Sequence, residues 1–333
     1  MYDSISPLEH FPSAGQKENT RHGESFFPLQ RYLSDLNASH SLVTAHWHEE
    51  AELTQILAGE CRYQIDLQKY RLHAGDFVLI APAQLHSITL TCDFDDKEYS
   101  EAGMTAVTGL SSKTDMTSSA ELPSKIGMTS ETYVFHLNFL GADSADLCAS
   151  QYLAPLSAGT LRFPCVIPAG HPAYETVRLY FSQIHTLYEE KPEGYELQLR
   201  AYFLLILCAL LPYASRRSEN ETSPDSIQME KMKTVLKYID SHLAEPLTVS
   251  ELAQLCNYSD YHFMRFFRKH AGMTCIEYIQ AMRAKKASRL LKEGKLSVLD
   301  AALSSGFNNL SYFYKVFKNH YGMTPKEFQR KFC

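Results

Sequence analysis

The sequence predicts two domains of different class: a β-sandwich or barrel with appended helices, followed by an all-α domain with two helix-turn-helix motifs. Three features predict this division. The first half has short strands separated by turns, the last hundred residues contain an internal repeat, and charge is divided unevenly between the two parts. The 333 residues leave room for two cores, and an apolar fraction of 45% is ordinary for a globular protein.

The first part of the chain is expected to hold an arm over residues 1–40 and a strand-rich domain over 41–213. Residues 93–132 are rich in Ser, Thr, Asp, Glu and Gly, and we expect a mobile insertion there. Turns are expected at 58–60 and 73–76. The expected strands are 53–57, 61–67, 77–80, 133–140 and 161–167.

Two helices are expected within residues 172–211, and a linker over 214–228. The second helix, 195–211, is apolar nearly all round, which suits a position in the core and an interface with a partner helix equally. The first helix repeats apolar residues at helical spacing. These are Val177, Tyr180, Phe181, Ile184 and Leu187.

The internal repeat lies between Leu247 and Arg330. The first copy reads Leu-Thr-Val-Ser-Glu-Leu-Ala from residue 247, and the second reads Leu-Ser-Val-Leu-Asp-Ala-Ala from residue 296. Phe-Met-Arg-Phe-Phe-Arg-Lys-His-Ala-Gly-Met-Thr at 263–274 then matches Phe-Tyr-Lys-Val-Phe-Lys-Asn-His-Tyr-Gly-Met-Thr at 313–324. Helix-turn-helix motifs are therefore expected at 248–270 and 297–320, within a domain spanning 229–333.

Each copy has the helix-capping residues of three short helices. The expected capping boxes are Thr248 with Glu251, Ser297 with Asp300, Thr274 with Glu277, and Thr324 with Glu327. The expected N-caps of the second helices are Ser259 and Asn308, and the expected C-caps are Gly272 and Gly322.

Net charge separates the two parts. Residues 227–333 contain 17 Lys and Arg against 9 Asp and Glu, a net charge of +8. The remainder contains 15 against 29, a net charge of -14, so the whole chain is at -6. A basic module joined to an acidic one suggests a polyanionic partner for the basic part, although a short helical domain often carries surplus Lys as well.

The second helix of each motif has an apolar face and a polar face. The apolar side chains are Phe263, Phe266 and Phe267 in the first copy and Phe313, Val316 and Phe317 in the second. The opposite face and the turn before it carry residue types that read base edges or hold phosphates. The candidate DNA-binding residues are Ser259, Tyr261, His262, Met264, Arg265, Arg268, Asn308, Asn309, Leu310, Ser311, Tyr314, Lys315 and Lys318. A solvated face explains one such helix, but two in a net-basic domain favour nucleic-acid binding.

A helix is expected to join the copies, because residues 276–293 lack Pro and Gly. It would span roughly 27 Å at about 1.5 Å per residue. Successive major-groove faces on one side of B-DNA are about 34 Å apart, so one chain could place both reading helices, and the shorter spacing would favour bent DNA. The candidates for additional phosphate contacts are Arg283, Lys285, Lys286 and Arg289.

Residues 229–331 resemble the DNA-binding domain of the AraC/XylS family of bacterial transcription regulators. The resemblance rests on Gly-Phe-Asn-Asn-Leu-Ser-Tyr-Phe-Tyr-Lys-Val-Phe-Lys from residue 306 and Tyr-Gly-Met-Thr-Pro from residue 321. It implies that the second helix of each motif enters the major groove, and that an effector domain precedes the DNA-binding domain. A homodimer formed through 172–211 and a contact with RNA polymerase are further expectations.

A second pattern lies in the strand-rich part. His46-Trp47-His48, Glu52 and Gly59, followed by Gly75, Pro82 and His86, resemble the two motifs of cupins, a jelly-roll barrel that often holds a metal. Two His on alternating strand positions point the same way, and with a third His and a carboxylate they could form a metal shell. Ala81 and Ala83 depart from the second motif. The candidate metal ligands are His46, His48, Glu52 and His86.

The resemblance favours a small-molecule pocket over a metal site, because effector domains of AraC-like regulators commonly keep a His-x-His remnant without metal. The candidate effector-binding residues are His46, Trp47, His48, Glu52, Tyr63 and His86. An aromatic platform with His and Glu would suit a sugar or another polar metabolite. We therefore expect a ligand-responsive regulator, more often an activator, and not an enzyme. The alternative is a metal-dependent cupin enzyme fused to a DNA-binding module.

Other classes are less well supported. Eight cysteines without a Cys-x-x-Cys pair argue against a zinc ribbon, and none has the activating neighbour that a thiol redox sensor requires. The N-terminus has no basic-then-apolar signal, and the longest apolar run, 201–211, is too short to span a bilayer. The protein is expected in the cytoplasm.

Overall fold

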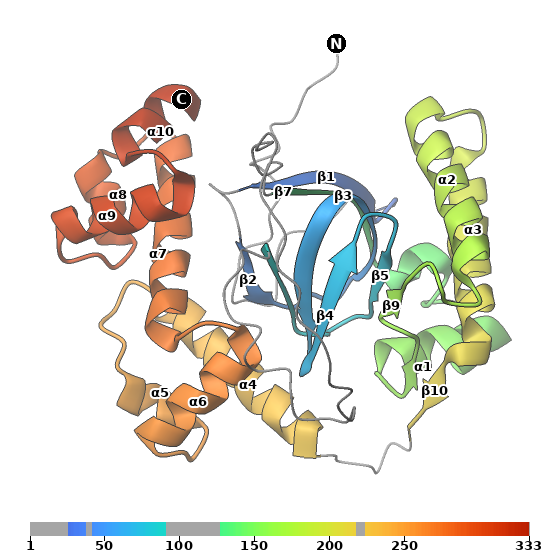
Figure 1. Ribbon diagram of the computed structural model, residues 1–333, viewed down its shortest axis with the longest axis horizontal. Coiled ribbons are helices and arrows are strands. Elements are labelled where there is room, and N and C mark those ends of the chain that lie inside the picture. Colours follow the sequence, from blue (N-terminus) through green and yellow to red (C-terminus); the bar gives the residue numbers. More distant parts are fainter. Residues whose placement is uncertain (1–25, 38–41, 91–126, 218–223, 333) are drawn as a thin grey trace, which may run out of the picture.

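The computed structural model describes residues 26–37, 42–90, 127–217 and 224–332. A strand-rich barrel lies at the centre, a pair of long helices lies on one side of it, and a helical domain lies on the other (Figure 1). Most of the arm expected over 1–40 and of the insertion expected over 93–132 falls outside the described residues.

The barrel consists of antiparallel strands in two sheets that share the long strand β3. The N-terminal half of β3 pairs with β7 and β5, and its C-terminal half pairs with β4 and β6. β1 pairs with β7, β2 pairs with β6, and β9 pairs with β5. The barrel strands are β1 (Leu29–Asn37), β2 (Leu42–His46), β3 (Ala51–Ile65), β4 (Gln68–His73), β5 (Phe77–Ile80), β6 (His86–Leu90), β7 (Gly127–Phe135) and β9 (Val166–Ile167). The short strand β8 (Leu161–Arg162) belongs to a separate two-stranded sheet.

The turn expected at residues 58–60 is wrong, because β3 runs through it. The register between β3 and β7 shifts between Ile56 and Ala58, so the strand bends at a bulge. Gly59 has φ 78°, and a Cβ there would lie 1.9 Å from the carbonyl oxygen of Gly127. The glycine therefore permits close contact between two strands. The sequence alone does not distinguish such a glycine from one in a turn.

Two further strand expectations are corrected by pairing with distant segments. β1 lies inside the expected arm and pairs with β7 from Leu29 opposite Phe135 to Asn37 opposite Gly127, so residues 127–132 belong to the barrel and not to the insertion. The strand expected over 133–140 ends at Phe135. Residues Leu137–Leu140 form a 3-10 helix, and the ring of His136 accepts a hydrogen bond from the Asn138 amide at 3.2 Å.

The long helices α2 (Tyr174–Glu190) and α3 (Tyr195–Leu210) occur where the sequence predicted them. One face of each is buried in the core that they share with the barrel, through side chains such as Phe181 and Phe203. The stretch Tyr195–Tyr213 has the length and composition to cross a membrane, with a mean hydropathy of 1.3 and 22% of it buried. A single helix of this kind is weak evidence for a membrane span, because helices of soluble proteins pass the same test.

The linker expected over 214–228 is shorter in the structure. β10 (Ser215–Arg216) pairs with β8, and α4 already begins at Pro224, a residue well suited to the first turn of a helix. The helical domain then continues with α5 (Val249–Leu255), α6 (Asp260–Ala271), α7 (Cys275–Lys292), α8 (Val298–Ser304), α9 (Leu310–Tyr321) and α10 (Pro325–Phe332).

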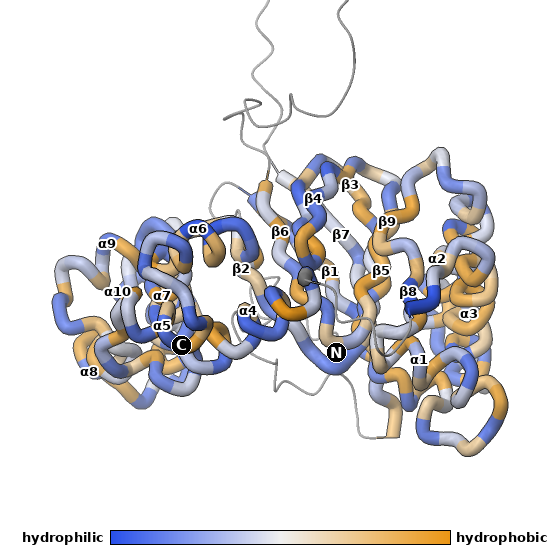
Figure 2. The backbone as a smooth tube through the Cα atoms, turned by 90° about the horizontal axis from the view of Figure 1, so that it is seen from below, coloured by the Kyte–Doolittle hydropathy of each residue, from blue (hydrophilic) through white to orange (hydrophobic). Residues whose placement is uncertain are grey.

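The barrel and the helical domain pack directly against each other, and the two views agree that β2 and β6 face the helices (Figures 1 and 2). One hydrophobic cluster contains Ala45, Trp47 and Leu85 of the barrel together with side chains from α4 to α7. The Tyr278 hydroxyl donates to the Ala45 carbonyl at 3.2 Å. Apolar packing and a hydrogen bond to a backbone carbonyl therefore join the two domains.

Candidate DNA interface and sensor site

The helices α6 and α9 hold equivalent positions in the two helix-turn-helix motifs. The Ser259 hydroxyl caps α6 by accepting from the His262 amide at 3.3 Å. Asn309, and not the expected Asn308, caps α9 by accepting from the Tyr312 amide at 2.9 Å. The expected capping boxes at Thr248 and Thr274 are both closed. Start points fixed by side-chain caps set which residues of each helix face outward.

The polar faces of α6 and α9 lie on the surface. Of the thirteen candidate DNA-binding residues, Tyr314 is half-buried and the other twelve are exposed. The opposite face of each helix is buried, with Phe263 and Phe267 in the first motif and Phe313 and Phe317 in the second. The Arg265 guanidinium lies over the Tyr261 ring at 5.8 Å, which orients it on the exposed face.

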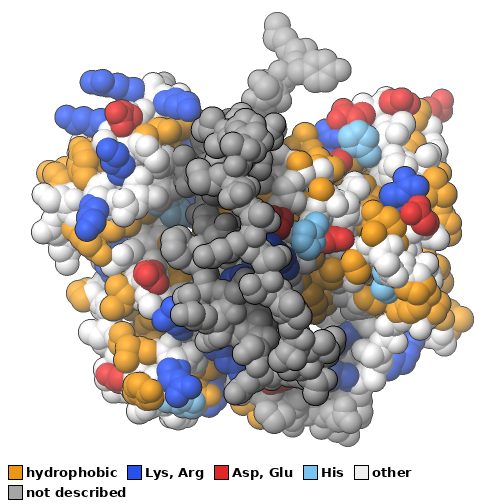
Figure 3. Space-filling model, viewed as in Figure 1, with side chains coloured by type: hydrophobic (Ala, Val, Ile, Leu, Met, Phe, Trp, Pro, Cys, Tyr) orange, Lys and Arg blue, Asp and Glu red, His pale blue; other side chains and the backbone are white. Residues whose placement is uncertain are grey.

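Basic side chains gather on this domain. Lys and Arg side chains lie over the helical domain, while hydrophobic ones gather over α3 at the other end of the molecule (Figure 3). The net charge of +8 counted over residues 227–333 is therefore carried by one structural unit. A basic surface of this kind attracts the phosphate backbone without reading sequence.

The two motifs are held together by an arginine that we expected to contact phosphate. Arg283 of α7 donates to the carbonyl of Leu243 at 2.9 Å and to that of Glu245 at 2.7 Å, and burial lowers its pKa. Gly306, in the turn between α8 and α9, has φ 91°, and a Cβ there would lie 2.5 Å from the Leu243 carbonyl oxygen. Arg283 and Gly306 therefore fix α7 and the second motif against the loop between α4 and α5, which leads into the first motif.

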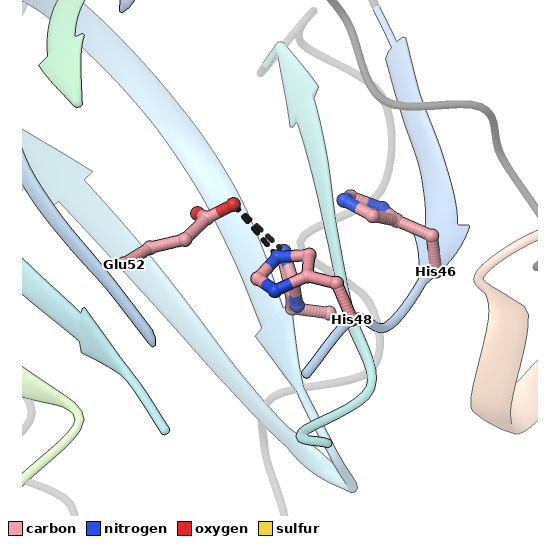
Figure 4. Close-up of side chains that lie close together, drawn as sticks. His46, His48 and Glu52 are labelled. Atoms are coloured by element: carbon pink, nitrogen blue, oxygen red, sulfur yellow. Dashed lines mark hydrogen bonds and ion pairs between the residues drawn. The ribbon is translucent and has the colours of Figure 1, made fainter. Parts of the chain in front are cut away.

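The structure brings His46, His48, Glu52 and His86 together inside the barrel. One potential ligand atom from each lies within 4.8 Å of all the others, and all four residues are buried. His46 ends β2, His48 follows it, Glu52 lies on β3 and His86 begins β6. Glu52 extends toward His48, and its Oε1 lies 2.9 Å from the His48 Nε2 (Figure 4).

Backbone carbonyls orient all three rings. Nδ1 of His46, His48 and His86 lies 2.9, 3.0 and 3.0 Å from the carbonyl oxygens of Thr44, Glu50 and Gln84, respectively. A carbonyl oxygen can only accept, so each Nδ1 carries a proton. Nε2 of His46 and of His86 is then left to present a lone pair to the cluster, whereas Nε2 of His48 donates a hydrogen bond to the Glu52 carboxylate, which can only accept.

Within the described part of the chain, two of these nitrogens are buried without a hydrogen bond, although that of His86 lies 3.8 Å from Glu52 Oε1. Nε2 of His46 and of His86 has no hydrogen-bond partner among the described residues. Such an unsatisfied buried atom costs about 1–3 kcal/mol in stability.

Electrostatics within the cluster favour a neutral His46 ring and an ionised Glu52 carboxylate. Burial lowers the pKa of His46 well below its usual range, and the neighbouring rings of His86 and His48 lower it further. Burial alone would raise the pKa of Glu52, but the His86 and His48 rings outweigh that effect and hold it well below its usual range. Neutral imidazole and ionised carboxylate are the states in which these groups bind metal ions.

The other two candidate effector-binding residues differ in position. Trp47 points away from the cluster and is buried between the barrel and the helical domain, because successive residues of an extended segment face opposite sides. Tyr63 packs in the apolar core of the barrel beside Ile65 and Val78. The aromatic platform expected beside the His and Glu is therefore not formed by Trp47.

Sequence reasoning missed Gln64. Its side-chain amide donates to the carbonyls of Lys269 at 2.8 Å and His270 at 2.9 Å, at the C-terminal end of α6. These carbonyls belong to the last turn of the helix, where backbone acceptors have no partner within the helix. A single Gln in a strand gives no sequence signal for this contact, since its partners are more than 200 residues away.

The buried cysteines are poor candidates for redox sensing. Burial raises the pKa of the Cys61 thiol to about 12 and that of the Cys275 thiol to about 12. Neither is a thiolate near neutral pH, and the thiolate is the reactive form.

Two outward-facing, capped helices on a basic unit, joined to a barrel with a buried polar site, define a DNA-binding regulator with a sensor domain. Comparison with known proteins agrees with that class. A model of a helix-turn-helix domain matches residues 252–331, and a model of an AraC-like ligand-binding domain matches residues 29–92.

Two relatives have names that agree with that class. The uncharacterized HTH-type transcriptional regulator YdeC of Bacillus subtilis is 22% identical over 316 residues, which cover 94% of this chain and 96% of that protein. The probable transcription factor PqrA of Proteus vulgaris is 33% identical over 97 residues, which cover 28% of this chain and 80% of that protein. A solved structure of ToxT from Vibrio cholerae covers 91% of this chain and 98% of its own, at 12% identity and a TM-score of 0.42.

The chain belongs to the AraC/XylS family of transcription regulators. It combines a ligand-binding domain with a helix-turn-helix domain that binds DNA.

Proposed function

We propose that α6 and α9 read promoter DNA in two neighbouring segments of the major groove, and that a signal received in the barrel adjusts this reading. The observation that carries the proposal is the repetition of one arrangement: a capped helix, an apolar face packed inward, and a polar face exposed on a basic surface. Base edges in the major groove are recognised by side chains of this kind.

The linking helix α7 sets the spacing between the reading helices. Its 18 residues span about 27 Å at 1.5 Å per residue, less than the roughly 34 Å between successive groove faces. Arg283 and Gly306 hold the two motifs rigidly, so the duplex is the partner that must adapt by bending. Bending energy depends on sequence and adds to specificity at base pairs that the protein does not touch.

Dimerisation through α3 would pair two such units. The outward face of α3 carries apolar residues three and four positions apart, and Leu197 is 73% exposed. This spacing matches the seam of two packed helices. The stripe consists of Leu197, Ala201, Leu204, Leu205 and Cys208.

We further propose that the protein acts in the cytoplasm as a regulator without an enzymatic activity of its own, and that activation through RNA polymerase is its output. The support for this is the family to which the chain belongs. The case for a sugar effector is weaker after Trp47 is placed between the domains, because the barrel cluster then offers only imidazole and carboxylate groups.

DNA reading is tested with the full chain and an operator selected from random duplexes. We expect Arg265→Ala to weaken specific binding by about 1–3 kcal/mol, as loss of a base contact does. We expect Lys315→Ala to lower the slope of log affinity against log salt concentration by about one, as loss of a phosphate contact does. Arg62→Ala and Lys69→Ala are matched controls, because both residues are exposed on the barrel.

Titrations at several fixed salt concentrations measure both quantities. Unchanged affinity in both reading-helix variants, or equal loss in the barrel controls, would contradict the assignment of the reading faces.

A further inference from the structure

We propose that the barrel cluster of His46, His48, Glu52 and His86 is a binding site for a divalent transition-metal ion, and that the bound ion controls how the barrel holds the first helix-turn-helix motif. This inference rests on the proposed function above and names the ligand class and the route of the signal.

The geometry of the cluster suits one ion. With metal–nitrogen distances of about 2.0–2.1 Å, ligand atoms of a single ion lie about 3 to 4 Å apart. The four atoms of the cluster lie within 4.8 Å of one another, so small side-chain adjustments bring them to that spacing. They come from the three strands β2, β3 and β6, which are anchored by barrel pairing, and from the loop between β2 and β3.

The donor atoms select the class of ion. Backbone carbonyls hold each Nδ1, so the Nε2 atoms of all three rings point toward one carboxylate oxygen, and an arriving ion would displace the Nε2 proton that His48 donates to Glu52. A histidine that binds a metal through one ring nitrogen usually donates the other N–H to a carbonyl, a carboxylate or water, as these three Nδ1 atoms do. Three imidazoles and one carboxylate suit zinc, nickel, cobalt, iron or manganese, whereas calcium and magnesium prefer oxygen ligands alone.

Burial adds an independent argument. His46 is 1% exposed and His86 is 2% exposed, and the Nε2 atoms of both are without a hydrogen-bond partner among the described residues. Two buried lone pairs beside a carboxylate form a site that a cation satisfies. An organic effector would instead need room, and the residues of the barrel core around Tyr63 are packed against one another.

The same segments that carry the ligands carry the contacts to the helical domain. His46 lies between Ala45 and Trp47, both of which belong to the interdomain cluster, and His86 follows Leu85, which belongs to it as well. Ligands and interface residues therefore alternate along the chain, with one set facing the cluster and the other facing the helices.

Two hydrogen bonds carry a backbone shift at these strands into the helical domain. The Ala45 carbonyl accepts from Tyr278 near the start of α7, and Gln64, opposite Ser87 in the pairing of β3 with β6, holds the last turn of α6. Movement of His46 or His86 onto an ion would displace these partners and change the orientation of α6 relative to the barrel. An ion that binds one orientation more tightly shifts the population toward it.

The metal site is tested with the full chain after treatment with a chelator. We expect binding of one equivalent of Zn²⁺ or Ni²⁺ by calorimetry and by elemental analysis, and no binding of Mg²⁺ at the same concentration. Glu52→Gln and His86→Ala should reduce affinity at least tenfold. His73→Ala is the matched control, because His73 is an exposed barrel histidine outside the cluster.

The route of the signal is tested by DNA titration with and without the metal and by hydrogen exchange over residues 269–278. We expect metal to change DNA affinity by about 5- to 150-fold, the usual range of coupling between two sites. Gln64→Ala should keep metal binding and lose most of this change. Circular dichroism confirms that each variant is folded.

The two claims can fail separately. Metal uptake that is absent, or equal in wild type, His86→Ala and His73→Ala, overturns the site. Stoichiometric metal with unchanged DNA affinity and unchanged exchange at 269–278 overturns the route. Metal content is measured without DNA, so a chain that binds metal but selects no operator would contradict the proposed function and leave the site intact.

Discussion

Replacement of Gly306 by Ala tests how the two helix-turn-helix motifs are fixed against each other. Gly306 has φ 91°, and an added Cβ would lie 2.5 Å from the Leu243 carbonyl oxygen and 2.8 Å from Arg283 Nε. The first contact is with backbone, which cannot move aside cheaply, and the second is with a side chain already bonded to Leu243 and Glu245.

The magnitude follows from two contributions. A left-handed backbone costs an L-residue about 1–2 kcal/mol. Forcing extra volume into a packed site costs about 1–3 kcal/mol more. We therefore expect Gly306→Ala to lower the free energy of unfolding of the helical domain by about 2–5 kcal/mol.

Gly272→Ala is the control that separates the two contributions. Gly272 also has a left-handed backbone, with φ 73°, but a Cβ there would meet only the Gln64 side-chain oxygen at 3.6 Å, an ordinary contact. We expect this variant to lose about 1–2 kcal/mol. In a domain of about 100 residues, each further kcal/mol lowers the midpoint by roughly 4–8 °C.

Calorimetry of the full chain measures both variants, with the two domains treated as separate transitions. Equal destabilisation by Gly306→Ala and Gly272→Ala would refute the argument that close packing at the Leu243 carbonyl holds the second motif.

Three further predictions follow from the structure. Burial lowers the pKa of His270 to about 4, below its ordinary value near 6.5. As pH falls, the unfolded chain therefore binds the proton before the folded chain does, and the folded state loses stability. The midpoint of urea unfolding should fall between about pH 6.5 and pH 4, and it should fall less in His270→Gln. Leu197→Glu should convert a dimer to a monomer in light scattering, because it places a charge on the exposed stripe of α3; an unchanged mass would place the interface elsewhere. Glu131→Ala should destabilise the barrel by about 3 kcal/mol or more in chemical unfolding, because the buried carboxylate accepts from Tyr133 at 2.7 Å and lies 2.9 Å from His185 Nδ1; a change below about 1 kcal/mol would contradict this.

Much of the DNA-binding domain could be predicted because its signals are local. Capping boxes at Thr248 and Thr274 and the left-handed glycines Gly272 and Gly322 all lie where the spacing placed them. The one-residue error at the cap of α9 arose because Asn308 and Asn309 are adjacent and chemically equal. The choice between them depends on the turn around Gly306, which is fixed by contact with Leu243.

The barrel was harder to predict because its strands are defined by distant partners. β1 looked like part of an unstructured arm, and its strand form comes from pairing with β7 about a hundred residues later. The bend at Gly59 resembled a turn for the same reason, since the close approach of Gly127 does not show in the local sequence.

The four side chains of the barrel cluster were identified through the resemblance to the two cupin motifs. The sequence by itself determined the repeat, the helices with their caps, and the two-faced reading helices. These depend on spacing along one segment, where periodicity assigns a face. The tertiary structure alone decided that Trp47 faces the helical domain while His46 and His48 face the cluster, that Gln64 holds the end of α6, and that Arg283 donates to the carbonyls of Leu243 and Glu245. In each case the side that a residue faces depends on which distant element covers it, and a local pattern contains no information about that element.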